Sequence, residues 1–242
     1  MIKHSDHIFK NSKNPILSPS PLPHRAIPFT EIHVDHFLPA LKEAIALAKK
    51  QMSEIGYQSD PPSFANTIEA MEIVGEQVDL VSSVFYNLLN AETSEKMQAL
   101  AEEIGPLLAN YSSDILLDTE LFSRVKAVYE SEKTKESSEL NPEQRTLLEH
   151  SYLDFARNGA MLSSREKDKL REIDVELSKM GPHFNQNVLK ATTNYFLHLQ
   201  EEEDVAGLPD SLKVAAAETA KERKQEGWIF TLDAPSIIPF LK

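Results

Sequence analysis

The sequence of 242 residues contains no cysteine. Disulfides, thiol nucleophiles and zinc sites with cysteine ligands are therefore excluded. The first residues, "MIKHSDHIFKNSKNP", have no apolar core of signal-peptide length, and no run of about 18 apolar residues follows. We predict a soluble, cytoplasmic protein without a membrane partner; an exported form whose leader has been removed is the alternative.

Basic residues are scarce relative to acidic ones. The chain has 25 Lys and Arg against 38 Asp and Glu, a formal net charge of −13. Nucleic acids and anionic membranes both require a basic face on the protein, and no Lys/Arg-rich patch with interleaved aromatic residues is present. We therefore predict no nucleic-acid partner, and the acidity is interpreted as an aid to solubility.

Glycine is also scarce, with 7 residues, whereas 14 prolines gather towards the N-terminus. This composition favours helices preceded by a stiff extended arm over a glycine-rich β fold. The few glycines form neither the G-x-x-x-x-G-K-[ST] nor the G-x-G-x-x-G phosphate loop, and the nucleophile motif G-x-S-x-G is absent. The sequence predicts no cofactor-binding residue and no catalytic nucleophile.

No pair of histidines has the H-E-x-x-H spacing that places two zinc ligands on one helical face. The histidines are His4, His7, His24, His33, His36, His150, His183 and His198. His33-Val-Asp35-His36 brings two imidazoles and a carboxylate together, either as a metal site or as solvated residues at a helix start with Asp35 as the N-cap. We favour the second interpretation and predict no metal ligand in this chain.

Apolar residues at helical spacing dominate the sequence from about residue 34. The predicted helices cover about residues 34–55, 64–88, 94–115, 119–135, 142–158, 163–195 and 208–226. Asn141-Pro142 and the Ser163/Glu166 pair are strong start signals, of the N-cap and capping-box kinds. Gly105-Pro106 should kink or interrupt one helix, and Gly181-Pro182 should bend the long one. The fold class is all-α, an antiparallel array of about seven helices.

Both ends of the chain differ from this helical pattern. Residues 1–30 carry prolines at 15, 19, 21, 23 and 28 and should form an extended arm. A flexible linker is one interpretation of this arm; its apolar residues favour one that packs along a larger body. Near the other end, Trp228 to Leu232 are β-branched and aromatic and predict a short strand without partners.

Several stretches resemble one enzyme family closely. They are "PPSFANTIEAME", "LNPEQRTLLEHSYLDFARNGAMLS", "GLPDSLKVAAAETAKERKQEGWIFTLDAPSIIPFL" and the segment from "NPIL" to "MSEI". They resemble the N-terminal region of the zinc oligopeptidases related to thimet oligopeptidase, oligopeptidase A and peptidyl-dipeptidase, with peptidyl-dipeptidase closest. The resemblance covers nearly the whole chain from about residue 14.

The resemblance implies a division of the chain and a role for it. It implies an N-terminal arm (1–30), a helical N-terminal lobe (31–226) and the start of a connection to the catalytic region (227–242). The lobe would form a wall of a channel for short peptides in a zinc peptidase that releases dipeptides from the C-terminus of its substrate. The family's zinc motif has no counterpart here, so the chain itself should be inactive and bind no zinc. An exposed apolar surface should mark where the catalytic lobe packs.

A stand-alone helical interaction module without enzymatic activity is the alternative. The two hypotheses differ in whether the reading frame continues past Lys242 into an H-E-x-x-H motif.

Overall fold

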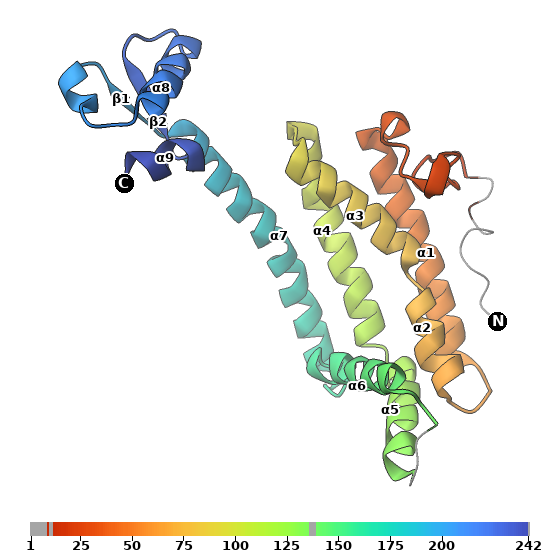
Figure 1. Ribbon diagram of the computed structural model, residues 1–242. Coiled ribbons are helices and arrows are strands. Elements are labelled where there is room, and N and C mark those ends of the chain that lie inside the picture. Colours follow the sequence, from red (N-terminus) through yellow and green to blue (C-terminus); the bar gives the residue numbers. More distant parts are fainter. Residues whose placement is uncertain (1–8, 10–11, 136–138, 242) are drawn as a thin grey trace. The chain divides into compact units, whose positions relative to one another are not determined.

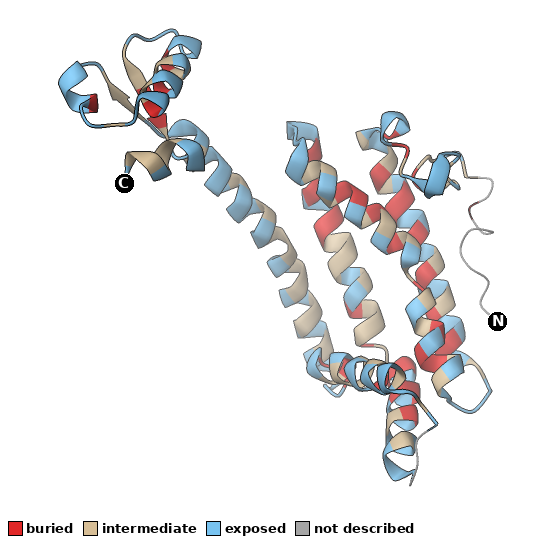
Figure 2. Cartoon of the chain, viewed as in Figure 1, coloured by how far each residue is buried: buried red, intermediate tan, exposed pale blue. Residues whose placement is uncertain are grey.

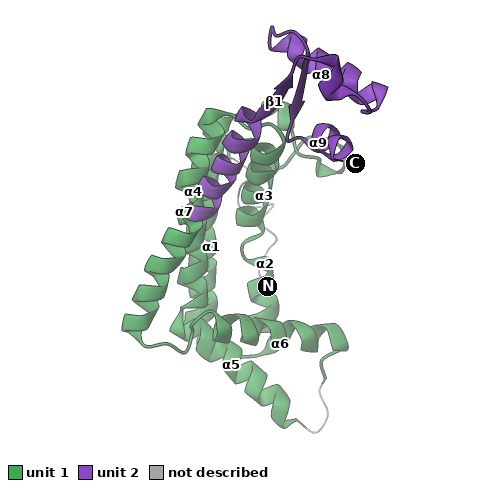
Figure 3. Cartoon of the chain, turned by 90° about the vertical axis from the view of Figure 1, so that its left-hand side faces the viewer, with its two compact units in different colours: residues 1–179 green, residues 180–242 purple. Residues whose placement is uncertain are grey.

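The computed structural model describes residues 9, 12–135 and 139–241. These residues form two compact units, residues 1–179 and 180–242, and the boundary falls within one long helix (Figure 3). Helices make up most of the described residues, and the strands among them form one two-stranded sheet. The predicted all-α class is confirmed.

The first unit is a set of helices joined by short connections (Figure 1). Its helices are α1 (Val34–Tyr57), α2 (Ala70–Ile73), α3 (Glu76–Ala91), α4 (Glu95–Leu116), α5 (Thr119–Thr134), α6 (Pro142–Arg157) and the first half of α7 (Ser164–Asn194). Side chains fix several of the starts, as the sequence predicts for Asn141, which accepts a hydrogen bond from the Gln144 N–H at 2.8 Å. Residues 136–138, between α5 and α6, lie outside the described residues.

Helix α1 is the centre of the first unit. It contacts α3, α4 and α5. Its apolar stripe is buried: Phe37 and Leu41 are at most 1% exposed, and the Phe37 ring meets the Phe85 ring of α3 edge to face, with centroids 5.3 Å apart. Burial of this stripe, which the sequence shows at helical spacing, is what holds the helices together.

The predicted helix over 64–88 is broken in the structure. A π-helix (Phe64–Glu69) and α2 precede Val74, which is extended, and Gly75, which has φ of +103°. Helix α3 begins after this left-handed residue. Glycine permits the break because it has no Cβ to clash in that conformation. The prediction of one continuous helix is wrong because the apolar spacing continues across the break.

The two Gly-Pro pairs do not interrupt α4 and α7. Helix α4 continues through Gly105-Pro106, contrary to the predicted interruption, and α7 continues through Gly181-Pro182. Bends at these positions remain predictions. Gly105 is buried, and a Cβ added there would lie 3.1 Å from the Ser178 carbonyl oxygen of α7, so its small size allows α4 and α7 to approach closely.

Part of the N-terminal arm packs on the first unit. Phe9, Ile16 and Leu17 are each 4% exposed and belong to the same core as α1. The Asn14 side chain donates a hydrogen bond of 2.7 Å to the His36 carbonyl oxygen. The arm also contains short 3-10 helices, Pro23–Arg25 and Phe29–Glu31, which have no buried residues. Residues 1–8 and 10–11 of the predicted arm lie outside the described residues.

The second unit contains a small sheet that the sequence did not predict. Strand β1 (Phe196–Leu199) pairs antiparallel with β2 (Trp228–Thr231), with Leu199 opposite Trp228. The prediction that the C-terminal strand lacks partners is therefore wrong. Its partner was missed because β1 begins two residues after the end of α7 and continues that helix's apolar character.

Two helices complete the second unit. Helix α8 (Asp210–Glu222) contacts β2, and α9 (Ala234–Phe240) follows β2 in the chain. Phe230 of β2 packs with Val205, Leu212 and Ala216 in a core separate from that of α1, and its ring lies 4.7 Å from that of Phe240. The second unit therefore has its own hydrophobic core, and the predicted strand is part of it.

Candidate functional site

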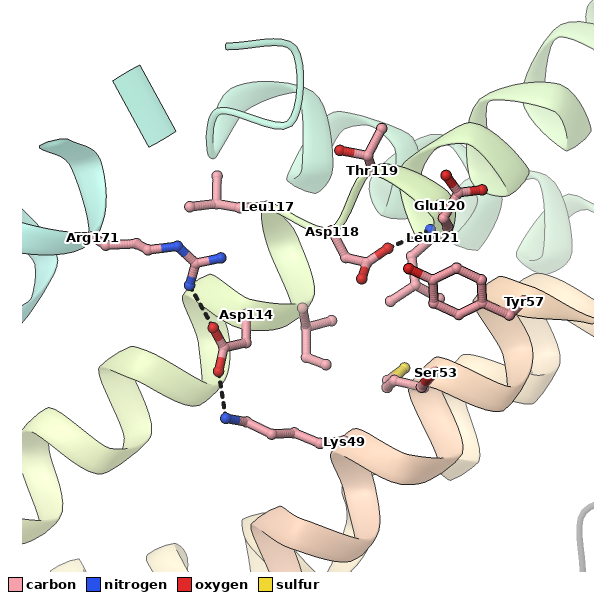
Figure 4. Close-up of a pocket in the computed structure, with 12 residues that line it drawn as sticks. Lys49, Ser53, Tyr57, Asp114, Leu117, Asp118, Thr119, Glu120, Leu121 and Arg171 are labelled. Atoms are coloured by element: carbon pink, nitrogen blue, oxygen red, sulfur yellow. Dashed lines mark hydrogen bonds and ion pairs between the residues drawn. The ribbon is translucent and has the colours of Figure 1, made fainter. Parts of the chain in front are cut away.

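A polar hollow in the first unit lies where α1, α4, the start of α5 and α7 meet. It encloses about 490 Å³, and Lys49, Tyr57, Asp114 and Arg171 are among the residues that line it. Lys49 and Arg171 point towards Asp114 from opposite sides (Figure 4). The hollow is large enough for a small ligand, so the partners of its polar groups decide what it can do.

Both carboxylate oxygens of Asp114 are engaged by cations. Arg171 Nη1 lies 2.5 Å from Oδ1, and the Lys49 ammonium pairs with Oδ2. These side chains are between 33% and 42% exposed, so water screens the pairs. A carboxylate held in this way joins α1, α4 and α7 and is poorly placed to act as a general base.

Polar groups in and beside the hollow also connect helices. Lys167 Nζ lies 2.9 Å from the Leu117 carbonyl oxygen and 3.3 Å from Thr119 Oγ1, and so ties α7 to the α4–α5 connection. Asp118 accepts a hydrogen bond of 2.8 Å from the Leu121 N–H and caps α5. We therefore interpret the hollow as a structural junction.

The His33-Val-Asp35-His36 segment caps a helix. His33 occupies the N-cap position of α1, and its N–H donates to His36 Nδ1 at 3.0 Å, which uses the lone pair that a metal would need on that nitrogen. The prediction that Asp35 is the N-cap is wrong. Asp35 instead pairs with Lys96 at 2.7 Å, and this hydrogen bond lowers the pKa of the Asp35 carboxyl below its usual value.

The other described histidines lie in elements other than the start of α1. His24, His150, His183 and His198 belong to four different elements, while His4 and His7 lie outside the described residues. Within the described part of the chain, no group of three or more His, Cys, Asp or Glu side chains could hold a metal ion. The described residues therefore do not fit a zinc ion.

Helix α7 has a polar face towards the first unit. Asp174 accepts a hydrogen bond of 3.0 Å from Ser113 Oγ of α4, Arg171 pairs with Asp114, and Ser178 lies against Gly105. None of the residues of α7, which the structure describes throughout, is buried (Figure 2). The helix is thus attached through polar contacts.

The apolar stripe of α7 is exposed. Ile173 is 55% exposed, Leu177 58%, Met180 60%, Phe184 68% and Val188 47%. Their spacing of 4, 3, 4 and 4 residues places them on one face of the helix. Helical periodicity in the sequence places these residues on one face of the predicted helix, together with the half-buried Leu170, but it does not show what covers that face. An exposed apolar surface of this kind is a candidate site of interaction.

Comparison with known proteins identifies relatives among the peptidases. No protein-family model matches the chain. The dipeptidyl carboxypeptidase of Escherichia coli is 33% identical over 220 residues, which are 90% of this chain and 32% of that protein. Oligopeptidase A of the same organism is 27% identical over 228 residues, 94% of this chain and 32% of that protein. The chain is a relative of the oligopeptidases. The resemblance seen in the sequence is confirmed.

More distant oligopeptidases also match the chain, and each match covers a similar share of the relative's length. The thimet-like oligopeptidase of Dictyostelium discoideum is 25% identical over 202 residues, 84% of this chain and 28% of that protein. The chain therefore spans about a third of the length of the curated relatives that it matches. None of its described helices has both the length and the apolar character needed to cross a membrane.

Proposed function

We propose that the chain is the non-catalytic, N-terminal helical part of a zinc peptidase that hydrolyses short peptides in the cytoplasm. The observation that carries this proposal is the extent of the similarity: 90% of the chain aligns with dipeptidyl carboxypeptidase, but only 32% of that enzyme is accounted for. The higher identity to dipeptidyl carboxypeptidase than to oligopeptidase A favours release of dipeptides from the C-terminus of the substrate.

In this proposal the helical part forms one wall of the substrate channel and supports the catalytic region. No zinc ligand is assigned to it, since its described side chains contain no suitable group. Zinc, when bound by the catalytic region, would activate water for attack on the peptide carbonyl. The contribution of this chain would be to restrict access by size and to supply packing surface, a role that agrees with the polar junction at Asp114 being fully engaged.

The proposal is tested by the gene itself. We expect the reading frame to continue beyond the codon for Lys242 and to encode an H-E-x-x-H motif. The pure 242-residue chain should cleave no peptide and hold no stoichiometric zinc. Chelator-sensitive peptide cleavage by the pure chain would contradict the proposed placement of the active site.

A stand-alone interaction module is the second candidate, because the exposed apolar face of α7 would also suit a helical binding protein. A natural stop codon directly after Lys242 would favour this candidate and would end the peptidase proposal.

A further inference from the structure

We propose that the exposed apolar face of α7, made of Ile173, Leu177, Met180, Phe184 and Val188, is the surface on which the remaining part of the peptidase packs. This inference rests on the proposed function and names the partner surface within it. Because the five residues lie on one unbroken helix, the periodicity of that helix alone places them on a common face.

In α7 the polar face contacts the neighbouring helices and the apolar face is exposed, which is the opposite of the usual arrangement. A helix on the surface of a globular protein normally buries its apolar stripe and exposes its polar residues. In α7, Lys167, Arg171 and Asp174 make hydrogen bonds or ion pairs with α4 and the α4–α5 connection. The five large apolar side chains of the proposed face are between 47% and 68% exposed. The apolar face of α7 is therefore not part of the core of the first unit, and we expect a further partner to cover it.

A second copy of this chain is a poor candidate for that partner. Two copies with a formal charge of −13 each repel one another, and Glu176, which is exposed, lies beside the apolar face. The alternating spacing of 3 and 4 residues that a coiled coil requires runs only from Leu170 to Phe184, or about two heptads, whereas a stable coiled coil needs about three or four.

The remaining part of the peptidase is the better candidate. The dipeptidyl carboxypeptidase relative is about three times as long as the matched segment, since 220 residues are 32% of it. A helical part that belongs to so large an enzyme must present a surface to the rest of it, and such permanent interfaces are rich in large apolar side chains. The face of α7 has that composition.

The test compares the same substitutions in two proteins, the 242-residue chain and the complete peptidase encoded by its gene. Leu177→Gln and Phe184→Gln replace exposed apolar residues with a good helix former. In the isolated chain both variants should melt at the wild-type temperature, which also shows that they fold. In the complete peptidase each should lower the melting temperature by several degrees and reduce peptide cleavage. Glu172→Gln, at an exposed position on another face of α7, should be neutral in both proteins.

The outcomes separate this inference from the proposed function. A gene without a downstream peptidase region ends the proposed function, and the inference with it. If that region is present but Leu177→Gln and Phe184→Gln affect the complete enzyme no more than the isolated chain, the inference is wrong and the proposed function stands. A dimer of the isolated chain that these variants abolish, with no effect on the complete enzyme, would assign the face to a second copy instead.

Discussion

Arg124 is a buried cation whose partners are backbone and amide oxygens. It is 7% exposed, and its guanidinium donates to the carbonyl oxygens of Gln58 and Asp60 and to Asn66 Oδ1, at 3.0–3.2 Å. Burial lowers the pKa of this guanidinium, with the Asp60 carboxylate opposing the shift. The side chain thereby fixes the connection between α1 and the π-helix from within α5.

Replacing Arg124 should destabilise the first unit. Arg124→Met leaves the Gln58 and Asp60 carbonyl oxygens without this donor, and an unsatisfied buried polar group costs about 1–3 kcal/mol. Urea unfolding followed by circular dichroism measures the change. Arg145→Met, at an exposed position of α6, is the matched control and should change the free energy of unfolding by less than about 0.5 kcal/mol. Equal effects of the two variants would contradict the role assigned to Arg124.

At alkaline pH, the stability of the folded chain depends on whether the Tyr111 phenol is ionised. Burial, assisted by the Asp79 carboxylate, raises the pKa of Tyr111 from 10.0 to about 12. The neutral phenol therefore stabilises the folded state fully below pH 10.0, and this contribution is lost as the pH rises towards about 12. Tyr111→Phe should reduce the fall in urea midpoint across this range. Tyr57→Phe, which removes an exposed hydroxyl, should retain the wild-type fall; a wild-type profile for Tyr111→Phe would refute the assignment.

At the scale of the elements, two glycines should respond oppositely to the same substitution. Gly75 has φ of +103°, where an L residue costs about 1–2 kcal/mol, so Gly75→Ala should destabilise the break before α3 by about that amount. Gly181 lies inside α7 with no atom within 4 Å of an added Cβ, so Gly181→Ala should stabilise that helix by up to about 1 kcal/mol. Urea unfolding compares them, and the same sign for both would contradict the backbone assignment.

Elements that the sequence predicts well are those with local signals. Asn141 and Ser163 start their helices as expected, and Ser163 N–H donates to the Glu166 carboxylate at 2.9 Å, which is one of the two hydrogen bonds of a capping box. The break at Gly75 was not predicted, because the apolar residues keep their helical spacing on both sides of it. Strand β1 escaped notice because its pairing with β2 joins residues about 30 positions apart, and no local pattern encodes such a contact.

The candidate sites were predictable to different degrees. The absence of a nucleophile or zinc motif was readable from residue spacing. The cap formed by His33 and His36 was not, because it depends on which nitrogen meets which N–H. The apolar residues of α7 were readable as a helical face, but their exposure depends on the polar contacts of Arg171 and Asp174 with α4, which only the folded chain provides.

At the scale of the whole molecule, the two units have separate hydrophobic cores and should be distinguishable by spectroscopy. The chain has one tryptophan, Trp228, which lies in β2 of the second unit. Tryptophan fluorescence therefore reports on the second unit, whereas most of the helical circular dichroism comes from the first. Phe230→Ala removes the aromatic centre of the second core, which should cost about 3–5 kcal/mol.

We expect this variant to move the fluorescence transition to lower urea while most of the circular dichroism transition stays in place. Phe85→Ala, in the core of the first unit, is the reciprocal variant and should move the circular dichroism transition. If both probes shift together in both variants, the two units unfold as one.

Asp114 sits where three helices meet, and this has a consequence for how the sequence can change over time. Lys49 and Arg171 pair with the same carboxylate. Loss of either cation leaves the other as the remaining partner of Asp114. Loss of Asp114 leaves two neighbouring cations without the anion between them. The cost of a substitution at one of these positions therefore depends on the residues at the other two. Positions 49, 114 and 171, far apart in the chain, form a single epistatic unit in which a charge reversal at one is tolerated best after a change at another.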